Sequence, residues 1–164
     1  MNFEIAVRQM TRFNVCKQFS GELGEANADV TQFVKLLPSQ DEKFNWLLRN
    51  IVSFTSAGSV LIFVTKKANC EDVANRLQKS DHSCGVIHGD LHQTERDKVL
   101  HQFKKKELSI LVATDVAARG LDIPSIRTVV NFDVARDIDT HTHRIGRTGT
   151  FYYFYNLYYF VIFW

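Results

Sequence analysis

The sequence lacks an excess of charge of either sign, and it lacks the cysteine spacing of a disulfide framework or a metal site. Its 164 residues carry 20 basic and 18 acidic side chains, a balance too even to indicate a nucleic-acid partner by itself. Cys16, Cys70 and Cys84 are odd in number and widely separated, with no CxxC pair. We therefore expect free thiols in a reducing, intracellular compartment and no tight metal site.

A secretory leader and a membrane span are also lacking. Charged residues interrupt the beginning of the chain, which therefore has no apolar core of a signal peptide. The charge-free stretch at 151–164 would extend about 21 Å as a helix. A bilayer has a hydrocarbon core of roughly 30 Å. We therefore expect neither a signal peptide nor a membrane partner.

Tyrosine is absent until the end of the chain. All five tyrosines lie in residues 151–164, FYYFYNLYYFVIFW, which hold half of the aromatic residues and none of the charged ones. The sequence thus divides near residue 150. A segment of mixed composition, long enough to bury the core of one domain, precedes an aromatic tail.

Hydrophobic periodicity before the tail indicates strands that alternate with helices. The pattern predicts strands at 31–37, 59–65, 84–89, 108–114 and 127–133. It predicts a helix over 40–54 with Ser39 as its N-cap. A second helix is predicted to start at an Asn69 cap, with Glu71 and Asp72 in its first turn. A third is predicted over 94–105. Strands separated by helices of about ten to fifteen residues form βαβ units. The predicted fold class is α/β, a parallel sheet with helices on both faces.

Polar clusters follow the predicted strands, where ligands gather in an open parallel sheet. They lie at residues 65–67, 88–96, 114–122 and 143–149. Each cluster alone has a plain interpretation as a solvated strand end, a turn, a glycine loop or a set of surface charges. Their occurrence together, at successive strand ends of one domain, favours a shared ligand site.

Together these segments resemble the second RecA-like domain of the DEAD-box RNA helicases. SVLIFVTKKANCEDVA is similar to the family's fourth motif, HGDLHQTERDKVLHQF to its Gln-x-x-Arg stretch, VATDVAARGLDIP to its fifth motif and HRIGRTG to its sixth. The resemblance implies a RecA-like sheet whose final strand and helix are missing or replaced here. It places the C-terminal RecA-like domain at 31–149, after a remnant of a first domain at 1–21 and a linker at 22–30, and before an aberrant tail at 150–164.

The resemblance also implies roles for individual residues. Asp122 corresponds to an aspartate that binds the ATP ribose, and Arg147 to a catalytic arginine finger that also binds ATP at its γ-phosphate. His143 and Arg144 are similar to residues that link two closed domains. The residues similar to the family's RNA-backbone contacts are Arg96, Thr114, Arg119 and Gly120.

The mechanism implied by the resemblance needs two RecA-like domains. ATP and RNA bind across the cleft between them, and closure bends the RNA and separates a short duplex. The implied partners are therefore RNA, single-stranded or duplex, and a first RecA-like domain, through which Mg²⁺ would be supplied with the ATP. A nuclear location is implied in the same way.

The sequence departs from the family pattern at several places. It contains no GxxxxGK[ST] phosphate loop and no Asp-Glu-Ala-Asp box. Thr150 stands where the sixth motif of the family ends in a second arginine finger. The absence of that arginine is expected to lower the rate of phosphoryl transfer roughly 10³-fold or more. Lys66 takes the place of a threonine that contacts RNA in the fourth motif, while Gln93 is expected to support the start of its helix. We therefore expect the chain alone to be inactive as an ATPase.

The aromatic tail leaves alternatives open. Its YYFVIF segment has strong β-propensity and could replace the missing strand, or else form an exposed, aggregation-prone segment. A frameshift or retained intron would explain the abrupt change at residues 149–150. For function, the alternatives are a C-terminal lobe of an ATP-dependent RNA helicase, a non-enzymatic RNA- or partner-binding fragment that competes with the intact helicase, and a truncated product without a stable fold.

Overall fold

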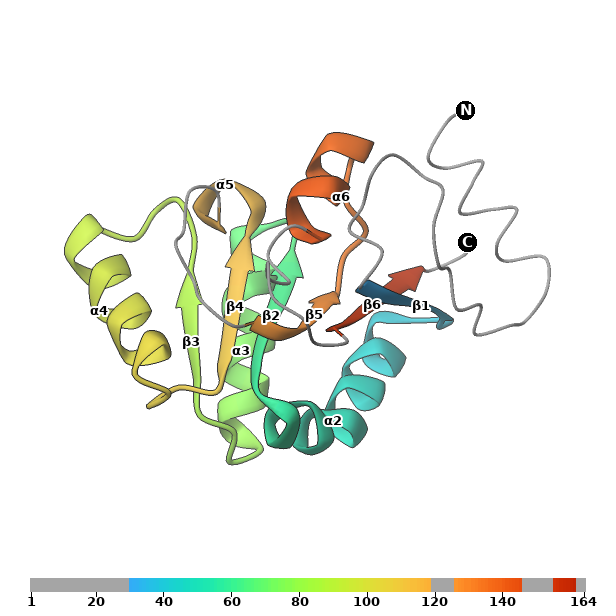
Figure 1. The fold of residues 1–164 in the computed structure, drawn as a ribbon, viewed down its shortest axis with the longest axis horizontal. Coiled ribbons are helices and arrows are strands. Elements are labelled where there is room, and N and C mark those ends of the chain that lie inside the picture. Colours follow the sequence, from blue (N-terminus) through green and yellow to red (C-terminus); the bar gives the residue numbers. More distant parts are fainter. Residues whose placement is uncertain (1–29, 119–125, 146–154, 162–164) are drawn as a thin grey trace.

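The fold is built on one parallel sheet, as a computed structural model shows (Figure 1). The structure describes residues 30–118, 126–145 and 155–161. The strands are β1 (Val30–Leu36), β2 (Ser59–Val64), β3 (Cys84–Ile87), β4 (Ile110–Thr114), β5 (Ile126–Asn131) and β6 (Tyr155–Val161). They lie in the order β1-β6-β5-β2-β4-β3, and every neighbouring pair is parallel.

The helices cover both faces of this sheet. They are α2 (Gln40–Ala57), α3 (Lys67–Lys79), α4 (Gln93–Lys104), α5 (Asp115–Ala118) and α6 (Ile138–Ile145). Side chains from α2 and α3 share one hydrophobic cluster with Val60, Ile62 and Val64. Leu61 and Phe63 point to the other face and pack with α4 and α5. The predicted α/β fold with helices on both faces is confirmed, and the continuous apolar run in β2 is explained by burial on both sides.

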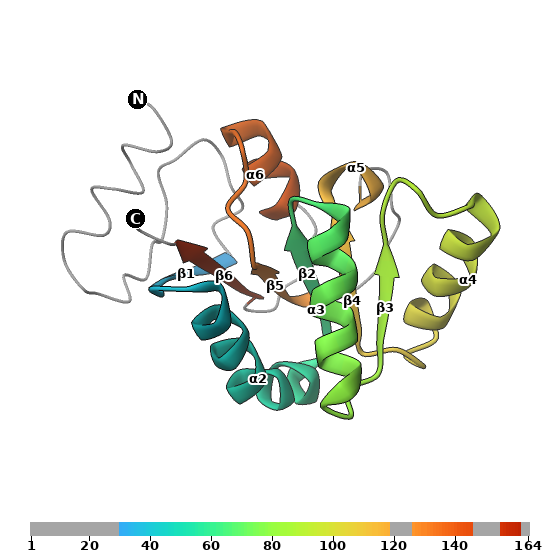
Figure 2. The ribbon, with the colours of Figure 1, turned by 180° about the vertical axis from the view of Figure 1, so that it is seen from behind.

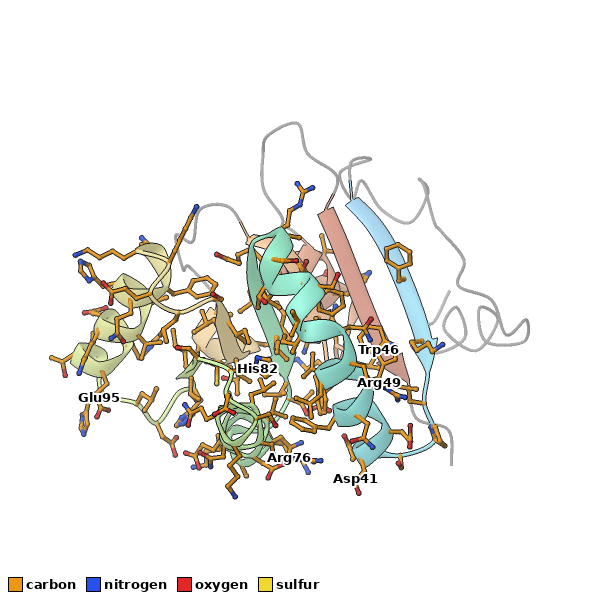
Figure 3. The ribbon with its side chains drawn as sticks, turned by 90° about the horizontal axis from the view of Figure 1, so that it is seen from below. Asp41, Trp46, Arg49, Arg76, His82 and Glu95 are labelled. Atoms are coloured by element: carbon orange, nitrogen blue, oxygen red, sulfur yellow. The ribbon has the colours of Figure 1, made fainter. Side chains whose placement is uncertain are left out.

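Helices α2 and α3, which cover the same face of the sheet, also contact each other through side chains at the surface. The Arg76 guanidinium lies over the Phe44 ring, 3.9 Å from its centroid, and donates a hydrogen bond of 3.2 Å to Asp41. Figure 3 shows Asp41 of α2 and Arg76 of α3 at this junction. The view from behind shows α3 in front of β2 and β4, running along them, with α2 to one side (Figure 2).

The expected elements are present with shifted ends, and one expected cap is wrong. The Ser39 hydroxyl accepts a hydrogen bond from the Glu42 backbone N–H at the start of α2, as predicted. The next helix, however, begins at Lys67, so Asn69 is inside it and does not cap it. The Thr65 backbone N–H is bound by the Asp133 carboxylate. With Thr65 held in this way, α3 starts before the expected cap at Asn69, and no side chain caps it.

The short helices α5 and α6 were missed as separate elements because neither carries a full hydrophobic repeat. The turn before β2 requires its glycine. Gly58 has a φ of +151°, and a Cβ at this position would lie 2.8 Å from the Arg127 Cβ. Among the described residues, no helix is both long and apolar enough to cross a membrane.

The aromatic tail contributes a strand to the sheet. Strand β6 lies between β1 and β5, with Tyr158 opposite Phe33 on one side and Val130 on the other. Of the alternatives for the tail, the replacement strand is therefore the one that the structure contains. The sheet thus continues beyond residue 149.

We predict that Tyr158→Pro destabilises the fold, because Tyr158 lies in an interior strand. Proline has no N–H to donate to the ladder. Leaving a buried partner unsatisfied costs about 1–3 kcal/mol. Tyr158→Thr keeps the backbone N–H and replaces tyrosine with another residue of high β-propensity, so it is the matched control. Urea unfolding followed by circular dichroism measures both variants, and equal midpoints for the two would contradict the placement of β6.

Candidate functional site

The carboxyl edge of the sheet is where the predicted site residues should meet. Because all strands are parallel, their carboxyl ends share one edge. Helices α5 and α6 lie at the edge toward which β2, β3 and β4 point (Figure 1). Three residues at this edge follow their strands directly: Thr65 after β2, Asp115 after β4 and Phe132 after β5.

The Arg144 side chain occupies the centre of this edge. It comes from α6 and is 1% exposed. Its Nε and Nη2 donate to the two oxygens of Asp115, at 2.6 and 2.8 Å. Its Nη1 donates to the Asn131 side-chain oxygen and the Asp133 backbone carbonyl, both at 2.7 Å. One guanidinium therefore connects α6 with the ends of β4 and β5.

The chemistry of arginine suits this position. The planar guanidinium binds a carboxylate through two parallel hydrogen bonds and still has donors for other acceptors. It also lies over the ring of Phe63 in β2, with its central carbon 4.9 Å from the ring centroid. A buried charge must be paired and hydrogen-bonded to be tolerated. Asp115 supplies the charge, and Asn131 and the Asp133 carbonyl supply the remaining acceptors.

A second polar cluster adjoins the first through Asp133. Its Oδ2 accepts hydrogen bonds from the Thr65 backbone N–H and hydroxyl, at 2.9 and 3.0 Å. The Lys43 ammonium lies 3.5 Å from its Oδ1 and donates to the Phe132 carbonyl at 2.9 Å. Lys43 is buried, and desolvation lowers its pKa, while the charge of Asp133 acts in the opposite direction.

Sequence reasoning missed both members of the Lys43–Asp133 pair. A signal for Lys43 was present, because it is four residues before Leu47 and eight before Ile51, on the buried face of α2. A lysine at such a position needs an acidic partner or a carbonyl. The sequence alone does not say which acidic residue faces it.

Two predicted RNA-contact residues, Thr114 and Arg96, lie near the same edge. Thr114 is the last residue of β4 and is buried. Arg96, from the first turns of α4, donates from Nη2 to the Ala117 carbonyl of α5 at 3.2 Å. Its Nη1 donates to Gln93 at 3.3 Å. Gln93 is the first residue of α4, where it also donates to Asp97 at 2.8 Å.

The other predicted site residues divide into two groups. His143 is exposed on α6, whereas Arg144 is turned inward, with the contacts of its guanidinium made within this domain. A contact of Arg144 with another domain remains a prediction. The residues that lie outside the described ranges are Arg119, Gly120, Asp122 and Arg147.

In the described ranges, no cluster of three or more His, Cys, Asp or Glu residues could hold a metal ion.

Charged groups also flank the turn that follows β3. Lys67, at the start of α3, forms an ion pair with Asp90, which raises the pKa of the lysine and lowers that of the aspartate. Both side chains are exposed. Lys66 is exposed beside them. At this edge Lys66 and Lys67 are therefore exposed, whereas Arg144 is buried beneath α6.

We predict that Arg144→Met destabilises the domain far more than Arg136→Met does. Removing Arg144 leaves Asp115 without its cation and two acceptors without donors, which costs about 3–5 kcal/mol for a buried pair. Arg136 pairs with Asp137 at 2.9 Å but is 72% exposed, so its removal should cost about 0–1 kcal/mol. Urea unfolding at neutral pH measures the difference. Equal losses of stability would mean that Arg144 is not buried as described.

We also predict that His141 makes the domain sensitive to mild acid. Burial, with a smaller contribution from the charge of Arg144, lowers the pKa of His141 from 6.5 to about 4. Below pH 6.5 the unfolded histidine binds a proton that the folded one does not, so stability is lost as the pH falls toward 4. Between pH 6.5 and 5 this amounts to at most about 1.5 kcal/mol. His141→Gln should flatten the decline of the unfolding free energy in this window, and an unchanged decline would contradict the assignment.

Comparison with known proteins identifies the family. The Helicase conserved C-terminal domain family matches residues 42–151. The ATP-dependent RNA helicase DDX42 of Gallus gallus is 68% identical over 129 residues, and that of Homo sapiens is 67% identical over the same length. Each alignment covers 79% of this chain, which spans only 14% of each relative.

Solved structures show the same relationship. The yeast DEAD-box splicing factor Prp28 matches with a TM-score of 0.77 and 32% identity, over 82% of this chain and 29% of that protein chain. The C-terminal domain of the DEAD-box protein Dbp5 matches with a TM-score of 0.69 and 33% identity, over 79% of this chain and 74% of that one. The chain therefore belongs to the Helicase conserved C-terminal domain family and is a C-terminal RecA-like domain of the DEAD-box RNA helicases.

Proposed function

We propose that the chain is the C-terminal lobe of an ATP-dependent RNA helicase, which binds the RNA backbone and completes an ATP site together with a first RecA-like domain. A nuclear setting belongs to the same proposal, through family resemblance. The observation that carries it is the hydrogen bond of 3.2 Å between Arg96 and the Ala117 carbonyl. This bond brings α4 beside the segment that follows β4, where the sequence motif continues to Arg119 and Gly120.

The chemistry of this edge favours phosphate over base recognition. Lysine ammoniums, an arginine and a threonine are donors suited to phosphate oxygens, and such contacts carry no sequence information. Cationic groups in the described part of this edge are Lys66, Lys67 in its exposed ion pair with Asp90, and Arg96, which is bound to Gln93 and the Ala117 carbonyl. RNA phosphates would compete with Asp90 for Lys67. RNA bound in this way would be held by its backbone, single-stranded or at the end of a duplex.

The ATP contacts follow from the family pattern. Asp122 would accept hydrogen bonds from the ribose hydroxyls, and Arg147 would donate its guanidinium to the γ-phosphate. The phosphate loop and the Mg²⁺ ligand would come from a first RecA-like domain. In this proposal Arg144 supports the helix that precedes Arg147 in sequence, because its side chain is already bound to Asp115.

The proposal is tested by ATP hydrolysis with a first RecA-like domain added in trans. The wild-type chain should give at most weak RNA-stimulated hydrolysis, because Thr150 replaces an arginine finger. Thr150→Arg should raise the rate by up to roughly 10³-fold. Thr150→Lys is the matched control, since it restores the charge without the planar fork.

The same assay separates the enzyme lobe from the binding fragment. In the Thr150→Arg background, Arg96→Ala should raise the RNA concentration needed for half-maximal stimulation, whereas Lys98→Ala on a different face of α4 should not. If Thr150→Arg gives no hydrolysis while the chain still binds RNA, the non-enzymatic alternative is favoured. In that case the proposed role in ATP hydrolysis is wrong.

A further inference from the structure

The segment that joins β2 to α3 is held by a side chain distant in sequence. Only Thr65 and Lys66 connect the two elements. Both Thr65 donors, its backbone N–H and its hydroxyl, bind Oδ2 of Asp133. Lys66 is extended, with φ −115° and ψ 141°, and makes no side-chain cap for α3. The conformation of this connection therefore depends on the position of the Asp133 carboxylate.

Asp133 is held in turn by Lys43. The Lys43 ammonium lies 3.5 Å from Oδ1 and donates to the adjacent Phe132 carbonyl at 2.9 Å. The side chains of Lys43 and Asp133 are only 5% and 10% exposed. Asn69 adds a longer contact of 3.5 Å to Oδ2. The backbone of the same aspartate is fixed on its other side, because its carbonyl accepts from Arg144.

The pair is a poor device for stability alone. Bringing two charges out of water costs free energy, and a well-packed neutral pair of similar volume is often as stable or more stable. Burial lowers the pKa of Lys43 despite the neighbouring carboxylate, so desolvation outweighs the attraction there. Stability alone is therefore a weak reason for a charged pair at this place, and the contacts of the pair lead to the lysines after β2.

We propose that the buried Lys43–Asp133 pair is a positioning element for RNA binding: it fixes Thr65 and thereby sets where Lys66 and Lys67 meet the phosphate backbone. This inference rests on the proposed RNA-binding function. Thr65 directs its hydroxyl inward to Asp133, which leaves the phosphate contacts to the lysines that follow. Lys43 and Asp133 themselves touch no RNA.

The test measures binding of the 164-residue chain to a fluorescent single-stranded RNA by anisotropy at several salt concentrations. The main variant is Lys43→Met combined with Asp133→Asn, because Lys43→Met alone would leave a buried carboxylate unpaired. We expect its melting temperature to stay within about 3 °C of the parent. Its affinity should fall about tenfold, and the slope of log affinity against log salt should decrease by about 0.7 for each phosphate that the lysines no longer neutralise.

Two further variants keep the test decisive. Thr65→Val removes only the hydroxyl and should weaken RNA binding, with little additional effect in the Lys43→Met/Asp133→Asn background. The control, Arg76→Met with Asp41→Asn, removes another ion pair between elements and should leave affinity and salt slope unchanged. If the main variant fails to fold, the effect of Thr65→Val alone decides.

The outcomes separate this inference from the function on which it rests. If the parent binds RNA and Lys66→Ala weakens it, while the Lys43→Met/Asp133→Asn variant and Thr65→Val bind as the parent does, the positioning role is wrong and the proposed function stands. If the parent shows no salt-dependent RNA binding, both are wrong. A drop in affinity matched by the Arg76→Met/Asp41→Asn control would also overturn the positioning role.

Discussion

The guanidinium of Arg144 is buried where β2, β4, β5 and α6 meet, and its charge is matched by Asp115 within the same domain. A buried arginine tolerates few arrangements, because each donor that loses its acceptor costs free energy. The ends of the strands are therefore held in one geometry relative to α6. Through the Asp133 carbonyl, this constraint extends to the connection between β2 and α3.

This arrangement explains how a hydrophobic sheet can present at one edge the cationic groups that we propose bind phosphate. The strands place their apolar side chains on two faces, and the polar residues described here lie at the carboxyl edge. Buried pairs there hold the backbone, while lysines after β2 and Arg96 in α4 remain for a ligand. The aromatic strand β6 completes the sheet between β1 and β5 by backbone pairing.

Much of the fold could be predicted from the sequence, because strands buried on both faces and amphipathic helices have distinct periodicities. The replacement strand could only be an alternative, since β-propensity in YYFVIF does not say which strands it will pair with. The start of α3 was mispredicted because the helix begins at Lys67 without a side-chain cap, and the preceding Thr65 is held by Asp133, sixty-eight residues later in the sequence. The burial of Arg144 could not be predicted from the sequence, because it depends on Asp115 and Asn131, which are brought together only by the tertiary fold.

The burial of Arg144 is tested most directly by nitrogen-15 NMR of the arginine side chains. A guanidinium held by Asp115, Asn131 and the Asp133 carbonyl should show an Nε–H that exchanges slowly with water and separate signals for its two Nη groups. Exposed arginines such as Arg136 should give averaged, fast-exchanging signals in the same spectrum. If the Arg144 signal were averaged and fast-exchanging too, the carboxyl edge would not be organised around this side chain.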